Sequence, residues 1–347
     1  MFWLVLAIIS TLAFGSQDTI NYYITNKLKY SGTSLTVVIH LFYTIIGFLG
    51  LFVVSLFNKN YSKKVFADLK NIIYKNPIFA ILAGLFGFAG NALVFQAYKI
   101  APKTLNPAVI TGIGNISIIF STLLAYIFYN KAINIKQGIG ILILLFALFL
   151  FGFKNFDDIK SVFISKKEDK KFSDKFTSSK SPKPTEPLFT REWFILAILS
   201  SIAYGGLAFF DYVLLQKNKN ATGLSIAISL GIMQTIIGFI PYFLFKFDIF
   251  KSFQTGFYKD YNQNIDGLLN YKILPYSISS AFLDILGLAT VILAYKGAPN
   301  PGFADSVSNT YLIPQALFTY LLFKTPIRSI QLVSIILAIV GITALSI

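Results

Sequence analysis

The chain carries one stretch twice: residues 3–27 read WLVLAIISTLAFGSQDTINYYITNK, and residues 193–217 read WFILAILSSIAYGGLAFFDYVLLQK. The two copies align without a gap, and a Trp, a Leu-Ala-Ile run, a Ser, an Ala, a Gly, a Tyr and the closing Lys recur in register. Most other positions are close exchanges, such as Phe14 with Tyr204 and Asn21 with Asp211. The repeat suggests that the chain consists of two related halves.

Three further matches support this duplication because they occur in the same order in both halves. A period of this length is far too long for a solenoid, and it indicates two half-proteins of related sequence. The matches pair residues 43–48 (YTIIGF) with 234–239 (QTIIGF), residues 97–102 (AYKIAP) with 294–299 (AYKGAP), and Tyr126 and Gln137 with Tyr320 and Gln331.

The composition is that of a membrane protein. Of the 347 residues, 55% are apolar, 16% are aromatic and only 13% are charged, and the mean hydropathy is +0.67. Soluble domains average about 25% charged residues. This apolar excess is too large to be buried in a water-soluble core of this size, so we expect lipid to surround the chain.

Several function classes are excluded by what the sequence lacks and by where it places charge. The chain has no Cys and a single His, so disulfides, thiolate catalysis and multi-histidine metal sites are not expected. It has no Walker A loop, HExxH motif or catalytic-triad pattern, so we expect neither an enzyme, nor a cofactor, nor ATP-driven transport. The formal net charge is +15. The Lys and Arg residues lie between apolar runs, which favours contact with a membrane surface over nucleic acid.

Ten apolar runs approach the length of about 20 residues that a helix needs to cross about 30 Å of hydrocarbon. The runs are too long and continuous for barrel strands, so the predicted fold is an all-α polytopic membrane protein. The first five are residues 3–24, 34–57, 78–98, 106–129 and 137–153, and the second five are residues 193–215, 223–245, 273–295, 302–323 and 330–347.

These runs divide the chain into a first five-helix repeat (residues 1–153), a middle segment (154–192) and a second five-helix repeat (193–347). The middle segment is rich in Lys, Ser, Asp and Pro. We expect it to be a charged, disordered linker, with a binding tail as the alternative. The connection at residues 246–272 is also expected to be solvated.

Five spans per repeat is an odd number, so the second repeat must enter the membrane in the opposite orientation to the first. Inverted repeats are a construction of secondary transporters, whose substrate site lies near the bilayer midplane between the repeats. The sequence therefore predicts ten transmembrane helices arranged as two inverted five-helix repeats. The distribution of Lys and Arg gives no orientation.

These features resemble the drug/metabolite transporter superfamily, in particular its ten-helix EamA-like branch. The likeness covers nearly the whole chain except the linker. It implies inverted repeats, cytoplasmic termini, a plasma or inner membrane location, and a central cavity lined by helices 1–4 and 6–9. The turns after the fourth and ninth spans lack the Glu that this family often has, which is typical of a distant branch. The resemblance rests on the W-x-x-L-A opening of each half, the turns at residues 97–102 and 294–299, residues 301–304 (PGFA), Pro314 and Gln331.

Acidic side chains inside apolar runs are functional candidates, because burying a charge at the bilayer centre costs roughly 3 kcal/mol. Asp284 lies about 16 Å into its helix. We favour it as a substrate or proton site over an acid that locks two helices together by a hydrogen bond. Asp18 lies about 23 Å into the first helix, where a vestibule and a site fit equally well. Asp211 and Asp305 are expected near helix ends, in contact with water.

Neutral polar residues at mid-depth form a second group of candidates for substrate binding or proton coupling. The alternative role of each is a hydrogen bond that joins two helices. These residues are Asn91, Asn115, Tyr204, Gln234, Asn309 and Gln315, with Tyr43.

Three further features of the apolar runs have structural interpretations. Pro314 is expected in the middle of the ninth helix, where it would free a backbone carbonyl beside Gln315. His40 is expected near the start of the second helix, at the interface or packed. Small residues on one face of the third helix permit close helix contact; they are Gly84, Gly87 and Gly90.

The function predicted from the sequence is a secondary transporter that moves a small organic solute by alternating access. Its partners are the solute and the lipid bilayer, and both a monomer and a homodimer remain open. The alternative is a non-transporting membrane receptor or scaffold that retains the transporter fold.

Overall fold

The computed structural model describes residues 2–103, 105–129, 133–151, 153, 191–218, 221–246, 264–297 and 307–346. Within these residues the chain is helical and has no strand. Seven helices are long and apolar enough to cross a membrane. Large apolar side chains cover the outer surface, where Phe52 is 62% exposed and Leu142 66%. The protein is therefore an all-α, multi-pass membrane protein.

The first half begins with a long helix that widens at its end into one π-helical turn. Its elements are α1 (Phe2–Tyr22), the π-turn η1 (Tyr23–Lys27), α2 (Gly32–Phe57), α3 (Lys59–Lys75), α4 (Pro77–Ile100), α5 (Ala108–Gly114), α6 (Ser117–Tyr129) and α7 (Ile135–Phe151).

The long helices of the second half follow one another in the same order as those of the first, and the described part of the second half has no counterpart of α3. Its elements are α9 (Glu192–Lys217), α10 (Gly223–Lys246), α12 (Leu274–Gly297), the 3-10 turn η4 (Asn309–Tyr311), α14 (Leu312–Phe323) and α15 (Ser329–Ser346).

Where the structure describes the end of a helix, that end lies within three residues of the end of the predicted span. Two of the predicted spans are interrupted. The run 106–129 breaks between α5 and α6, and the run 302–323 contains η4 before α14 begins. Residues 298–306, which include the predicted Asp305, and most of the predicted linker lie outside the described residues.

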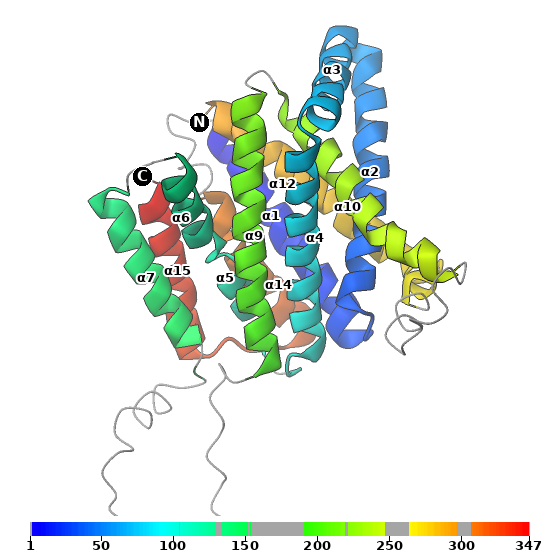
Figure 1. Ribbon diagram of the computed structural model, residues 1–347. Helices are drawn as coiled ribbons and strands as arrows, with labels where there is room; N and C mark the ends of the chain where they lie inside the picture. The colour runs from blue at the N-terminus through cyan, green and yellow to red at the C-terminus, as the bar shows by residue number, and fades with distance from the viewer. Residues whose placement is uncertain are drawn as a thin grey trace, which may run out of the picture.

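The long helices pack in pairs that join the two halves. Helix α1 packs against α12 and α14, α9 packs against α4 and α6, α2 packs against α10, and α7 packs against α15. Both termini lie at the upper end of the molecule in Figure 1, and α1 and α9 run in opposite directions through it. Neither half therefore forms a core of its own.

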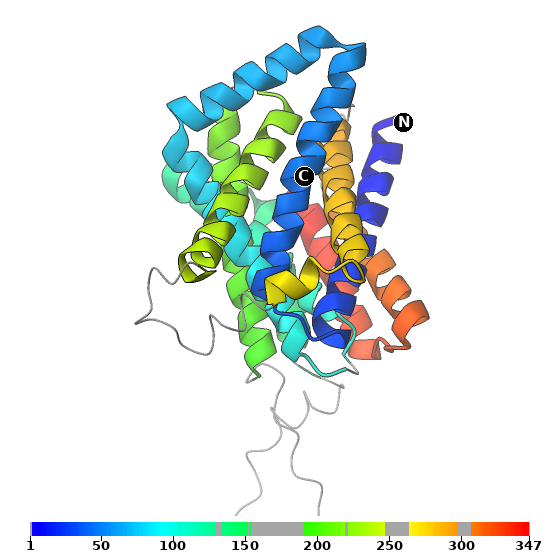
Figure 2. The ribbon, with the colours of Figure 1, turned by 90° about the vertical axis from the view of Figure 1, so that its right-hand side faces the viewer.

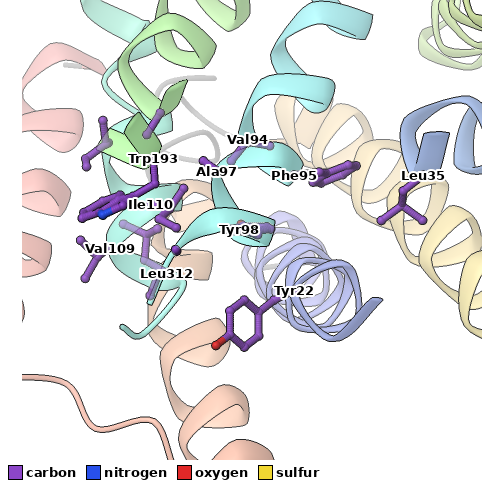
Figure 3. Packing of buried hydrophobic residues seen from close by; sticks show 14 of the residues in the cluster. Tyr22, Leu35, Val94, Phe95, Ala97, Tyr98, Val109, Ile110, Trp193 and Leu312 are labelled. Carbon is purple, nitrogen blue, oxygen red and sulfur yellow. The ribbon is translucent and has the colours of Figure 1, made fainter. Parts of the chain in front are cut away.

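The largest buried cluster lies where α1, α4, α5 and the second half meet. Figure 3 shows Trp193 of α9 and Leu312 of α14 packed among Val109 and Ile110 of α5. All four side chains are buried. This cluster couples the start of the second repeat to the fourth helix of the first.

Helix α3 occupies residues that the sequence analysis left as a connection between two spans. Figure 2 shows it crossing from the end of α2 to the start of α4. Val65, Leu69 and Ile72 are buried along one side of it at helical spacing, and α3 contacts α2 and α10. The Asn58 side chain caps its first turn by accepting from the Tyr61 amide at 3.0 Å.

The prediction of a solvated connection at residues 246–272 is wrong for its final part. Residues 264–268 form a short helical turn, and Ile265 and Leu268 are completely buried in the main cluster. The Asn264 side chain also accepts from the Ser31 amide at 2.8 Å. This turn therefore packs beneath α2 and does not project into solvent.

The glycines of α4 permit the close contact that their spacing predicts. A Cβ atom at Gly84 would lie 2.5 Å from Met233 Cβ of α10, and one at Gly87 would lie 2.1 Å from Gln234 Nε2. A Cβ atom at Gly90 would lie 2.7 Å from the Tyr204 ring of α9. Helices α9 and α10 therefore approach α4 where it has no side chains.

Candidate functional site

A cavity of about 340 Å³ lies at the centre of the bundle. Its walls come from both halves of the chain: α1, α2, α4, α5 and α6 on one side, and α9, α10, α12 and η4 on the other. The cavity brings together eight of the nine residues that the sequence analysis favoured. These are Asp284, Asp18, Tyr43, Asn91, Asn115, Tyr204, Gln234 and Asn309.

Asp18 and Asp284 face the same part of this cavity from α1 and α12. They lie close enough for their charges to interact. Asp18 Oδ2 accepts a hydrogen bond of 3.2 Å from the Thr111 hydroxyl of α5, and Gln17 lies beside Asp284. Asp18 therefore lines the central cavity together with Asp284.

Asp211 also lines the cavity, and the expectation that it contacts water at a helix end is wrong. It does lie six residues before the end of α9. However, its Oδ1 atom is buried and has no hydrogen-bond partner among the described residues. Helix α9 packs against α4, α5 and α6, and Asp211 lies on the side of α9 that faces the cavity, so closeness to the helix end does not place it at the outer surface.

A chain of hydrogen bonds joins α9, α4 and α2 across one wall. The Tyr204 hydroxyl donates to Asn91 Oδ1 at 2.6 Å, and Asn91 Nδ2 lies 3.2 Å from His40 Nε2. The amide group can donate to His40 only if Nε2 carries no proton. His40 is packed, as expected, but it is 2% exposed and lines the cavity, so it does not lie at the membrane interface.

A second chain of hydrogen bonds leads from α14 to Asp18. Gln315 Nε2 donates to the Tyr98 hydroxyl at 3.1 Å, and the Tyr98 hydroxyl is paired with the hydroxyl of Thr111, which in turn donates to Asp18. Gln315 is fully buried and is the one predicted site residue that does not line the cavity. Its position behind Tyr98 suits an orienting role.

Both broken helices contribute polar groups at their breaks. Asn115 follows the last residue of α5, and its Oδ1 accepts from the Tyr311 hydroxyl of η4 at 2.7 Å. Pro314 lies in the middle of the helical stretch described at residues 307–323 and in the first turn of α14. The missing N–H of a proline costs no helical hydrogen bond there. The break is the 3-10 turn η4 that precedes α14.

The sequence analysis did not identify Gln17, Thr111 or Tyr311 as cavity residues. Gln17 is the residue before Asp18, and Tyr311 follows the predicted Asn309 by two positions. Closeness in sequence to a candidate could therefore have identified both. Thr111 lies in a run of small and apolar residues and has no such signal.

The charged side chains that line the cavity are acidic. Its described lining contains three carboxylates and no Lys or Arg side chain. Its aromatic walls come from Phe14, Tyr43, Tyr204 and Tyr311. No group of three or more His, Asp or Glu side chains among the described residues is arranged to hold a metal ion. The cavity can thus bind positive charge and apolar groups at once.

Comparison of the chain with models of known protein families and with curated proteins finds no match.

Proposed function

We propose that the protein is a secondary transporter that moves a small organic solute across the membrane by alternating access. The observation that carries this proposal is the central cavity, which is lined by carboxylate, amide and hydroxyl groups at the depth of membrane-spanning helices. Polar groups at that depth are costly, and in membrane proteins they mark solute pathways.

The proposal includes ten spans arranged as inverted repeats, and matching contacts in the two halves support it. The Tyr204 ring of α9 covers Gly90 of α4, where an added Cβ would lie 2.7 Å away. The Phe14 ring of α1 covers Gly287 of α12 at the same distance. Phe14 and Tyr204 are equivalent in the repeat, and so are Gly90 and Gly287. Each first helix therefore packs on the third helix of the other half in the same way.

Other contacts between the halves also recur at equivalent residues. A Cβ atom at Gly15 would lie 2.8 Å from Pro314, and one at the equivalent Gly205 would lie 2.4 Å from Phe120. The hydroxyl groups of Thr44 and Thr235, which are equivalent residues, lie 3.2 Å apart. A residue that meets its own counterpart must lie on the axis that relates the halves, so this axis would pass beside the cavity.

A site on such an axis suits alternating access, because exchanging the conformations of the two halves opens the opposite side of the cavity. The proposal assigns the closure of one end to aromatic side chains of α1, η1, α4 and α14. Tyr22 packs on Tyr98 and Phe323 with ring centroids 6.0 Å and 5.8 Å apart, and Tyr23 stacks on Phe323 at 5.7 Å. In the proposed cycle these aromatic contacts separate when that end opens.

The proposal is tested by uptake into liposomes that contain the purified protein. A panel of amines, amino acids, nucleosides and sugar phosphates is offered with and without a pH gradient. We expect saturable uptake of at least one solute and its loss in Asp284→Asn. Glu192→Gln is the matched control, because this acid is exposed at the start of α9 and lies outside the cavity.

Two results would contradict parts of this proposal. Asp284→Asn that transports as well as the wild type would remove Asp284 from the site. A solute that binds to the cavity but is never taken up by folded protein would instead favour the receptor or scaffold function.

A further inference from the structure

We propose that the cavity takes an organic dication with amino groups at both ends of a flexible chain, such as a linear diamine or polyamine. One ammonium group would lie at Asp211 and the other at the Asp18–Asp284 pair. This inference names the substrate class of the transporter proposed above and rests on that function.

The sign of the substrate charge follows from the lining of the cavity. Three carboxylates reach it, and no cationic side chain among its described residues compensates them. In a low-dielectric interior, unpaired carboxylates attract a cation and repel an anion far more strongly than they do in water. The faces of Tyr43, Tyr204 and Phe14 add surfaces that favour ammonium groups and alkyl chains.

Two positive charges are inferred because the carboxylates lie at two levels. Tyr204 lies near Asp18 and Asp284. Asp211 follows Tyr204 by seven residues on α9, so it lies on nearly the same face and about 10 Å further along the helix axis. A single ammonium group cannot reach both levels.

The space between the two levels is continuous. Tyr43 lines the cavity and lies within electrostatic range of both Asp284 and Asp211. Two charge-assisted hydrogen bonds of about 2.8 Å take up about 6 Å of this axial offset of about 10 Å, and the lateral offset between the helices adds to the span. A linear diamine of about three carbons or more can therefore reach both levels. The described structure therefore favours a linear diamine over a compact cation.

The state of Asp211 independently indicates a missing ligand. Its Oδ1 atom is buried without a hydrogen-bond partner in the described part of the chain, although buried carboxylates are normally paired. Asn21, the equivalent residue of the first half, has its Oδ1 occupied by the Ser280 hydroxyl at 2.7 Å. Each residue thus has one buried atom without a partner among the described residues, a donor nitrogen in Asn21 and an acceptor oxygen in Asp211. An ammonium group would supply the partner that Asp211 lacks.

The test measures binding to purified full-length protein in detergent, where no gradient or flux is needed. The probes are 1,5-diaminopentane, pentylamine, 1,5-pentanediol and glutarate, which share a five-carbon chain and differ in charge. We expect the diamine to bind at least about tenfold more tightly than the monoamine, because a second buried ion pair forms. The diol and the dicarboxylate should bind more weakly than either amine.

A variant then assigns the second ammonium group. Asp211→Asn should reduce the affinity for the diamine to that for the monoamine. Glu192→Gln should change neither. Should Asp211→Asn not fold, diamines of three to eight carbons compared on the wild-type protein give the same information, since two fixed carboxylates require an optimum chain length.

Several results would overturn the inference: equal affinity for diamine and monoamine, no dependence on chain length, an unchanged diamine affinity in folded Asp211→Asn, or preferred binding of glutarate. Uptake of a different solute class in liposomes would also overturn it and leave the transporter function standing. Diamine binding without uptake would instead overturn transport and leave the dication site standing.

Discussion

The substitution Gly90→Ala tests the contact that holds the first helix of one half against the third helix of the other. The new Cβ atom would lie 2.7 Å from Tyr204 Cδ1 and Cε1 and 3.1 Å from Cγ. The ring cannot move aside freely, because its hydroxyl donates to Asn91 at 2.6 Å. Either α4 and α9 separate, or the ring rotates and this hydrogen bond is lost.

The expected cost follows from these two alternatives. Overpacking a buried contact costs about 1–3 kcal/mol, and losing a buried hydrogen bond adds about 1 kcal/mol, so the free energy of unfolding should fall by about 2–4 kcal/mol. Reversible unfolding in mixed micelles measures this change. Gly50→Ala is the matched control, since no atom lies within 4 Å of its added Cβ. It should stabilise α2 by up to about 1 kcal/mol.

A double mutant shows whether the clash with Tyr204 is the cause. In a Tyr204→Ala background the ring is absent, so Gly90→Ala should have no further cost. Gly287→Ala should show the same behaviour with Phe14→Ala, with a smaller loss of about 1–3 kcal/mol because Phe14 has no hydrogen bond to lose. A stability of Gly90→Ala equal to that of Gly50→Ala would refute the contact, and so would a cost that persists without the ring.

Three other measurements test separate parts of the structure. Asn106→Leu should lower the free energy of unfolding by about 2–3 kcal/mol, because the buried Asn106 amide donates to the carbonyls of Ala316 and Thr325 at 3.3 Å and 3.1 Å. The control Asn60→Leu, at an exposed position, should lower it little. Equal losses of stability in the two variants would contradict the structural role of Asn106. The chain has no Cys, so Tyr23→Cys with Phe323→Cys provides a unique pair at the end proposed to be closed. A short bifunctional maleimide should cross-link the pair and stop uptake without abolishing binding, and continued uptake by fully cross-linked protein would exclude opening at this end. The affinity for the diamine should fall as the pH is lowered, because protons compete with ammonium groups for the carboxylates. Asp211→Asn should reduce this pH dependence. An affinity that does not change with pH would show that the carboxylates do not bind the ammonium groups.

The positions of the long helices could be predicted from the sequence because each is a nearly uninterrupted apolar run. The amphipathic helix α3 could not be found this way. Its residues are too polar to read as a span, and its buried stripe of Val65, Leu69 and Ile72 has meaning only once α2 and α10 are in place. The helix breaks at Asn115 and η4 were missed for a related reason, since apolar composition alone does not show whether a backbone is continuously helical.

The candidate site was predicted in its residue types more than in its geometry. Polar residues in apolar runs are few, so most of them could be singled out, and the structure places them around one cavity. Depth along a helix was a poor guide for Asp211. It measures distance from the helix end, whereas burial depends on which neighbours enclose the side chain. Gln315 shows the converse, because it is buried in the bundle and faces Tyr98 instead of the cavity.

The packing contacts recur in both halves of the chain, whereas the acidic residues of the candidate site do not. Contacts that hold the helices together recur in both halves, as the glycine contacts of Tyr204 and Phe14 show. The acids do not recur. Asp18 is matched by Ala208, Asp211 by Asn21 and Asp284 by Gly87. Packing must be equivalent in both halves if they are to exchange conformations. A single cavity beside the axis that relates them has room for only one solute, so each half is free to supply different groups to it. The asymmetry of charge is therefore what we expect of one shared binding site in the proposed transporter, and it would give a bound dication a fixed direction between Asp211 and the Asp18–Asp284 pair.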